Sequence, residues 1–243
     1  MLISKGILSR ENVDHQLQSG RRHRHPANSK TSLPVRRTNP QKFPLAINYS
    51  GLCRSAGAET VDALVAFLRQ HLPLKWTELY SAMASHPVNV VKVNRGTYQY
   101  LYDFHSGLEA LGEVSFDQRI RDRVIGVLGT SAPTRGPRRG SLQNGCLDLP
   151  EELPSSPRDK GHFIAHSIGG GLDINVFFQD RDLNRGVSHA GKLYREMERY
   201  CHSNPGTFCF SRPVYAGTTS VPQWLEFGLI KKDGTLWVET FEN

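Results

Sequence analysis

The chain has 243 residues, 38% of them hydrophobic and 22% charged, which is enough for one ordinary domain with a buried core and a tail. Four cysteines in this length require no disulfide scaffold, and the sequence has no run of about 18 apolar residues that could span a membrane. The net charge of +7 comes from residues 1–45, which hold nine basic and two acidic residues, whereas residues 46–243 hold 21 of each. The basic pI therefore describes one end of the chain and indicates no basic groove in the remainder.

Residues 1–45 are predicted to form a disordered basic arm. Residues 15–45 mix Arg, His, Ser, Asn and Pro with almost no aliphatic periodicity, so apolar burial cannot offset the entropy lost on ordering. Such an arm can hold nucleic acid or an acidic surface loosely. The first residues contain no apolar stretch of signal-peptide length. We expect a protein that is cytoplasmic at synthesis and that, if secreted, leaves by a signal-peptide-independent route.

Residues 46–97 are predicted to be a helical segment. Apolar residues recur at three- and four-residue spacing in residues 58–72, as on one face of an amphipathic helix. Residues 75–84 predict a second short helix with Trp76 on its inner side. We interpret both helices as packing elements.

Residues 98–243 are predicted to be an α+β domain with an antiparallel sheet, and its first part reads as two strands. Residues 98–103 predict a strand, Ser and Gly a turn at 106 and 107, and residues 108–116 a returning strand. Residues 130–160 are rich in Pro, Gly, Ser and Arg and predict a long surface loop. Loops of this length inside a compact domain often carry function.

The segment that follows this loop reads as strand, turn, strand and helix. The strands are predicted at 161–166 and 174–178, with a turn that three consecutive glycines require at 169–171. Residues 180–186 predict a loop, and residues 192–200 predict a helix.

The end of the chain predicts three further strands, at 207–215, 223–230 and 236–241. An Asp-Gly pair separates the last two, and this pair between alternating runs is typical of a β-hairpin. The fold class that results is α+β, with a C-terminal β-hairpin.

Two side chains in this region suit phosphodiester hydrolysis, which requires a general base and a cation beside the phosphate. His162 can be neutral near physiological pH and accept a proton from water. Asn184 offers an oxygen to Mg²⁺, which keeps several waters and needs few protein ligands. Glu198, on the predicted helix, could orient those waters. An enzyme that contacts only the sugar-phosphate backbone of its substrate would not distinguish between bases.

Residues 98–243 resemble the DNA/RNA non-specific endonucleases with a ββα-metal active site, in particular the branch found as C-terminal toxin domains of bacterial secreted proteins. Five elements carry the resemblance, in the family's order: Asp159 to His162, Asn175 to Gln179, the Leu-Asn-Arg-Gly run at 183–186, Tyr194 to Glu198, and Pro213 to Gly217. The resemblance implies a ββα-metal nuclease core preceded by the helical segment and the arm.

The resemblance also implies site roles, cofactors and partners. Catalytic residues would be His162, Glu198 and Arg121, the metal ligand Asn184, and the substrate-binding residues Lys160, Asn175 and Arg185. The cofactor would be Mg²⁺ (or Mn²⁺), and the partners DNA and RNA, together with a cognate inhibitor or immunity protein. The chain departs from the family in two places: Lys160 stands where many members have Arg, and the arginines at 119–123 lack the Gln that usually follows.

Each site residue also has a structural interpretation. His162 could be an ordinary strand histidine, or it could bind zinc with His166, although the cysteines lack zinc-finger spacing. Asn184 could be a turn former and Glu198 a solvated helix charge. Cys201 and Cys209 could pair in an oxidising compartment, but their spacing favours free thiols.

Two other functions stay open at the level of the sequence. The chain could be a non-catalytic nucleic-acid-binding or interaction module that uses the basic arm, in which case removing residues 1–45 would abolish most binding and its salt dependence. Alternatively, the arm could be an export or docking segment of a toxin whose producer carries an antidote.

Overall fold

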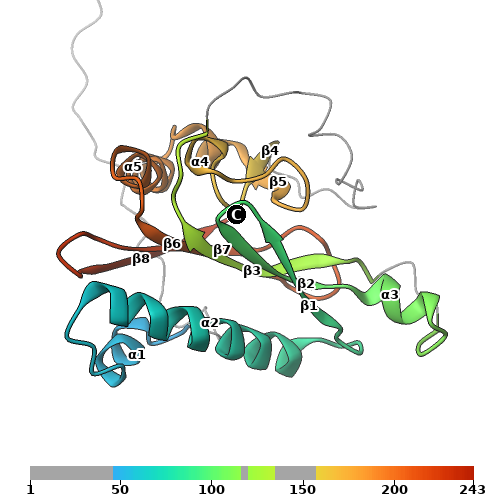
Figure 1. The fold of residues 1–243 in the computed structure, drawn as a ribbon. Coiled ribbons are helices and arrows are strands. Elements are labelled where there is room, and N and C mark those ends of the chain that lie inside the picture. The colour runs from blue at the N-terminus through green and yellow to red at the C-terminus, as the bar shows by residue number, and fades with distance from the viewer. Residues whose placement is uncertain (1–45, 116–119, 135–156) are drawn as a thin grey trace, which may run out of the picture. The chain divides into compact units, whose positions relative to one another are not determined.

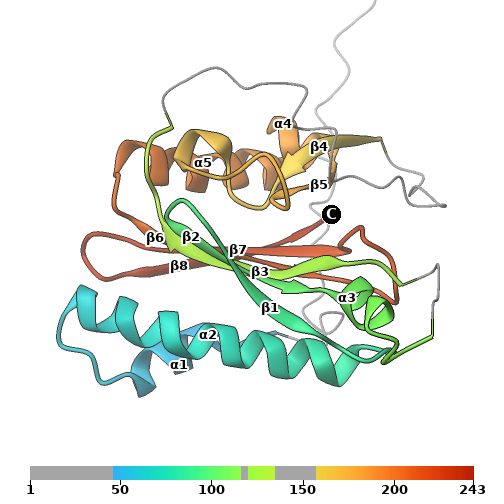
Figure 2. The same ribbon diagram turned by 45° about the vertical axis from the view of Figure 1, so that its right-hand side comes forward.

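The computed structural model describes residues 46–115, 120–134 and 157–243, and the residues from 46 onward belong to one compact unit. The predicted disordered arm lies outside the described residues, as does most of the predicted loop at 130–160. The fold is α+β, as expected, with one antiparallel sheet between two layers (Figures 1 and 2). Helices α1 and α2 cover one face of the sheet, and the segment from β4 to α5 covers the other.

The sheet has six strands in the order β1-β2-β3-β6-β7-β8, and every neighbouring pair is antiparallel. Their bounds are β1 (Val90–Arg95), β2 (Tyr98–Asp103), β3 (Arg123–Thr130), β6 (Phe208–Val214), β7 (Trp224–Ile230) and β8 (Leu236–Glu242). The three predicted C-terminal strands and the hairpin between the last two are confirmed. Gly234 in the hairpin turn has φ 82°, a conformation that favours glycine.

The layer below the sheet consists of α1 (Tyr49–Ser55) and α2 (Val61–Met83). The sequence predicted two separate helices, at 58–72 and 75–84. This separation was wrong, because α2 is one helix that continues through Pro73. Leu68, Leu72 and Trp76 lie four residues apart and are all buried against the sheet. This continuous apolar face holds the helix together across the proline, despite the hydrogen bond that proline cannot donate.

The strand predicted at 108–116 was wrong. The chain forms a short helix, α3 (His105–Ala110), whose start is held by Asp122, which accepts hydrogen bonds from the amide and hydroxyl of Ser106. The partners of β2 are β1 and β3 instead. Because β1 lies within the segment predicted to be helical at 46–97, the boundary expected at residue 97 falls inside a β-hairpin.

The layer above the sheet has the predicted order of strand, turn, strand and helix. It contains β4 (Arg158–His162), the short 3₁₀ helix η3 (His166–Ile168), β5 (Val176–Asp180), α4 (Arg181–Arg185) and α5 (His189–Ser203). Two boundaries needed correction. The first strand ends at His162 rather than at 166, and the loop expected at 180–186 contains α4, whose first amides are capped by Asp180.

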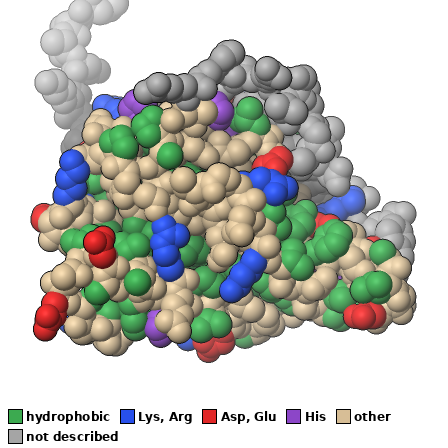
Figure 3. Space-filling model, in the orientation of Figure 1, with side chains coloured by type: hydrophobic (Ala, Val, Ile, Leu, Met, Phe, Trp, Pro, Cys, Tyr) green, Lys and Arg blue, Asp and Glu red, His purple; other side chains and the backbone are tan. Residues whose placement is uncertain are grey.

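Both faces of the sheet are buried, which gives two hydrophobic clusters. Towards α2, the cluster includes Trp76, Ile125 and Phe210, and towards α5 it includes Val127 and Tyr194. None of the described helices combines the length and the hydropathy that crossing a membrane requires. On the face shown in Figure 3, basic and acidic side chains are interspersed, in keeping with the 21 charges of each sign in residues 46–243.

Candidate active site

The β4–β5 hairpin carries the first of the predicted site residues. In the antiparallel register His162 lies opposite Val176, Lys160 opposite Phe178, and Arg158 opposite Asp180. Because side chains alternate along a strand, Arg158, Lys160 and His162 share one face of the hairpin. Lys160 is exposed and His162 is 7% exposed.

The glycine before His162 is required by close packing. A Cβ atom at Gly161 would lie 2.2 Å from Oε1 of Gln179, which lies on β5 opposite Asp159. The carbonyl oxygen of His162 accepts a hydrogen bond of 3.2 Å from the hydroxyl of Tyr194 on α5. The end of β4 is therefore held from both sides, which limits where the imidazole can lie.

Asp159 joins β4 to α4. Its carboxylate accepts hydrogen bonds from Nε and Nη2 of Arg185, at 2.7 and 3.0 Å, from Nδ2 of Asn184, at 3.3 Å, and from Nε of Arg181, at 3.3 Å. The hydrogen bond from Arg185 is the main cause that lowers the pKa of Asp159 below its ordinary value. Since a carboxylate can only accept, it must face the amide nitrogen of Asn184, and the amide oxygen is left to bind a cation.

Glu198 lies on α5, one turn after Tyr194, and is 8% exposed. Nη1 of Arg195 donates to its carboxylate at 3.3 Å. This burial argues against the interpretation of Glu198 as a solvated helix charge. Through Tyr194 and Asp159, the structure brings together the elements that carry His162, Asn184 and Glu198.

Two other predicted residues lie in different surroundings. Asn175 is fully buried, where its amide bonds both backbone groups of Ile164 and the carbonyl of Gly171. It therefore shapes the loop between β4 and β5, and in this conformation it has no surface for a substrate. Arg121 is partly exposed and precedes β3 of the large sheet, whereas the other site residues come from the segment between β4 and α5.

A cation site here would rest on few protein ligands. Within the described ranges, no group of three or more His, Cys, Asp and Glu side chains is placed to hold a metal ion, so a zinc site built on His162 and His166 finds no third ligand of these types. Nδ1 of His166 lies 3.2 Å from the carbonyl oxygen of Gly170. The oxygen of Asn184 and the carboxylate of Glu198 are hard donors, which suit Mg²⁺ with most of its water shell retained.

Cys201 and Cys209 are free thiols in the structure, as predicted, and both are buried. A hydrogen bond with Cys209 and burial both raise the pKa of Cys201 above its ordinary value. These thiols therefore lie in the core as small apolar groups.

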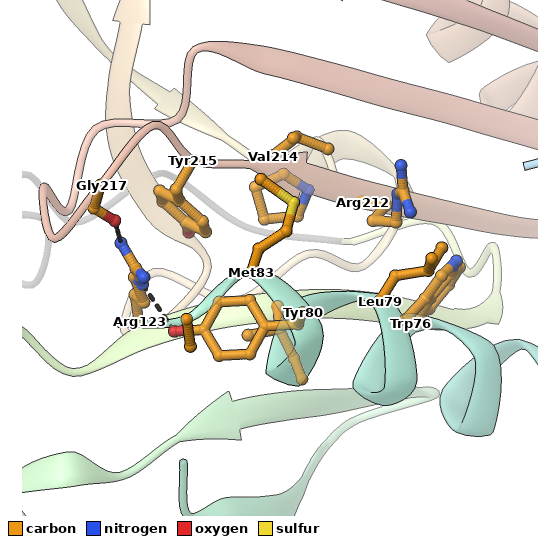
Figure 4. A pocket seen from close by; sticks show the side chains of 12 residues that line it. Trp76, Leu79, Tyr80, Met83, Arg123, Arg212, Val214, Tyr215 and Gly217 are labelled. Atoms are coloured by element: carbon orange, nitrogen blue, oxygen red, sulfur yellow. Dashed lines mark hydrogen bonds between the residues drawn. The ribbon is translucent and has the colours of Figure 1, made fainter. Parts of the chain in front are cut away.

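A pocket opens on the opposite face of the sheet, between the end of α2 and β6 (Figure 4). Its walls include Trp76, Tyr80, Met83 and Tyr215. Arg123 lies at its edge, where it donates to the hydroxyl of Tyr80 at 2.7 Å and to backbone carbonyls that include Gly217, at 3.0 Å. None of the predicted site residues lines this pocket.

Comparisons with known proteins add little to this geometry. No family model matches the chain, and no curated protein matches it. A solved structure of Sda1 nuclease with a bound zinc ion is similar to this chain, with 15% sequence identity and a TM-score of 0.33, over 64% of this chain and 74% of that one. Values this low do not establish a shared fold, so the site must be argued from its own residues.

Proposed function

We propose that the chain is a metal-dependent endonuclease that hydrolyses phosphodiester bonds in DNA and RNA without sequence specificity. The observation that carries the proposal is a pair of hydrogen bonds that join β4 to two helices. Nδ2 of Asn184 on α4 donates to the carboxylate of Asp159, and the hydroxyl of Tyr194 on α5 donates to the carbonyl of His162. A base, an amide oxygen and a buried carboxylate thereby come from three elements that are fixed to one another.

His162 would act as the general base. A neutral imidazole can accept the proton of the attacking water near physiological pH. Its place at the end of β4, with its carbonyl held by Tyr194, limits its movement relative to the helices. Lys160, which shares its face of the hairpin, would contact the phosphate as a point charge.

The oxygen of Asn184 would hold Mg²⁺ (or Mn²⁺), with waters and phosphate oxygens as the remaining ligands. When bound, the cation would neutralise charge that develops on the phosphate. Glu198 would accept hydrogen bonds from the waters of the cation. Asp159 acts through Asn184, because it orients the amide.

Substrate contacts beyond Lys160 would involve exposed arginines. Nε and Nη2 of Arg185 donate to Asp159. The side chain of Arg185 is 58% exposed, so the other side of its guanidinium could contact a phosphate. Arg121 would contact a phosphate from the segment that precedes β3. The buried Asn175 is left out of the proposed site. The inhibitor protein, which the resemblance implies, and export without a signal peptide stay predictions.

The test uses the purified full-length chain with plasmid DNA and RNA in the presence of Mg²⁺. We expect cleavage of both, its loss with EDTA, and a fall of about 10²- to 10⁴-fold for His162→Ala, the range for removal of a general base. His189→Ala is the matched control, because His189 is an exposed histidine at the start of α5. Cleavage by His162→Ala at the wild-type rate would overturn the proposal.

A further inference from the structure

Arg158, the first residue of β4, has charged groups that the fold does not satisfy. Its Nε and Nη1 atoms are shielded from water and have no hydrogen-bond partner in the structure. Other arginines of this layer have acceptors: Arg181 and Arg185 donate to Asp159, and Arg195 donates to Glu198. Two guanidinium nitrogens that have lost water without gaining an acceptor are costly, whereas the third, Nη2, is not among the shielded, unpartnered atoms.

The carboxylate of Asp180 does not provide the missing acceptor. Asp180 lies opposite Arg158 in the hairpin register, and its charge partly offsets the effect of burial, which lowers the pKa of Arg158. However, Oδ1 of Asp180 accepts from the amides of Asp182 and Leu183, where it caps α4. The carboxylate is thus held at the helix start.

The position of Arg158 on the hairpin indicates what the acceptor would be. Arg158, Lys160 and His162 share one face, and residues two apart on a strand are separated by about 6.6 Å. Two cations therefore precede the proposed base in a row. A nucleic-acid strand carries a matching row of oxyanions, and the guanidinium can contact a phosphate through Nη2, which is not among its shielded atoms.

We propose that Arg158 binds a backbone phosphate of the substrate strand, beyond the phosphate that His162 and Lys160 contact. This inference rests on the proposed nuclease function and makes the preferred substrate a polynucleotide strand. A phosphodiester with no neighbouring phosphate would occupy only the end of the row next to His162.

The first experiment measures binding of a fluorescein-labelled single-stranded oligonucleotide to His162→Ala and to the double variant His162→Ala/Arg158→Met, by anisotropy at several salt concentrations. We expect Arg158→Met to weaken binding on the order of tenfold and to reduce the slope of log K against log salt by roughly 0.7, the value for one phosphate contact on a single strand. His162→Ala/Arg158→Lys should keep the slope. His162→Ala/Arg54→Met is the control for charge, because Arg54 is exposed on α1, across the sheet. An unchanged slope and affinity for Arg158→Met, or equal losses for Arg54→Met, would overturn the inference.

The second experiment keeps His162 and compares kcat/KM for the oligonucleotide with kcat/KM for bis(4-nitrophenyl) phosphate. Arg158→Met should lower the first on the order of tenfold and leave the second unchanged, because the small ester has no neighbouring phosphate. Equal losses on both substrates would overturn the inference while leaving the nuclease function intact. Failure of the wild type to cleave nucleic acid would instead overturn the proposed function, and the inference with it.

Thermal unfolding separates binding from a structural role. Because the fold does not satisfy the Arg158 guanidinium, Arg158→Met should melt at the wild-type temperature or above it. A lower melting temperature, together with unchanged oligonucleotide binding by the folded variant, would assign Arg158 to stability and contradict the proposal.

Discussion

The arginines on the two sides of the sheet are not all paired in the same way. On the α2 side, Arg212 pairs with Glu226 at 2.7 Å, and Arg123 donates to Tyr80 and to two backbone carbonyls. On the α5 side, Arg158 has shielded nitrogens without an acceptor, and it shares a face with His162. Arg123 and Arg212 serve packing, whereas the inference above gives Arg158 a ligand from outside the fold.

Two histidines on the two sides of the sheet lie in different surroundings. His86, near the end of α2, bonds the fully buried Asp103 at 2.9 Å and has a side chain that is 1% exposed. His162 ends a strand of the small hairpin, beside the exposed Lys160. The proposed function gives His162 a chemical role, whereas the buried hydrogen bond of His86 serves stability, and four predictions can break or sharpen this division.

The largest expected effect separates the two histidines. His162→Ala should lower the rate of Mg²⁺-dependent plasmid cleavage by about 10²- to 10⁴-fold and change the melting temperature less than His86→Ala does. His86→Ala should do the reverse, because it removes a hydrogen bond from a buried carboxylate, at a cost of about 1–3 kcal/mol. Activity should be measured at low temperature, where both variants are folded. Loss of cleavage by folded His86→Ala would break the comparison.

The next effect concerns the core below the sheet. Trp76 packs against Phe210, and its indole nitrogen donates to Tyr49 at 3.3 Å. Trp76→Ala should lower the free energy of unfolding by about 3–5 kcal/mol, as measured by urea denaturation. Cleavage per folded molecule should stay close to the wild-type value, since Trp76 lies across the sheet from β4. A large fall in this specific activity would show that the two layers are coupled.

A glycine in the upper layer should affect stability and activity together. A Cβ atom at Gly170 would lie 1.9 Å from the carbonyl oxygen of Ile164 and 2.8 Å from Nδ2 of Asn175. Gly170→Ala should therefore disrupt the loop that Asn175 holds, destabilise the fold by about 2 kcal/mol, and reduce cleavage. Gly171→Ala is the matched control, because its closest contact is the side chain of Asp173. Equal effects of the two substitutions would contradict the packing argument.

The smallest effect is a dependence on pH. Asp159 has a lowered pKa in the folded state, so it contributes stability above its unfolded pKa, near 4, and this contribution is lost as the pH falls through the folded value. Asp159→Asn should therefore be destabilising near neutral pH and nearly neutral at about pH 2. Denaturant titrations at both pH values test this. The same loss at both would show that Asp159 acts through hydrogen bonds that do not require its charge.

Much of the upper layer could be predicted from the sequence, because its signals are local. Consecutive glycines at 169–171 require a turn, and the Tyr-Arg-Glu-Met-Glu run contains good helix formers. The positions of His162, Asn184 and Glu198 along the chain followed from these signals. The role of Asp159 as the hydrogen-bonded link to α4 was not predicted, because its partners Asn184 and Arg185 lie 25 and 26 residues further along the chain.

The large sheet was predicted less well. β3 escaped prediction because it is buried on both faces and lacks alternation between polar and apolar residues. The segment after β2 contains Leu, Glu and Ala, which suit a helix, and the structure forms α3 there instead of the expected strand. Pairing with strands distant in the sequence decided which segments joined the sheet.

By itself, the sequence determined the α+β class, the C-terminal hairpin, and the order of strand, turn, strand and helix that carries the candidate site. These features depend on periodicity and turn residues, which act over a few positions. Tertiary structure alone decided the continuity of α2 across Pro73, the burial of Asn175, and the arginine left without an acceptor. Each of these depends on what packs against a side chain, and that neighbour comes from another part of the chain.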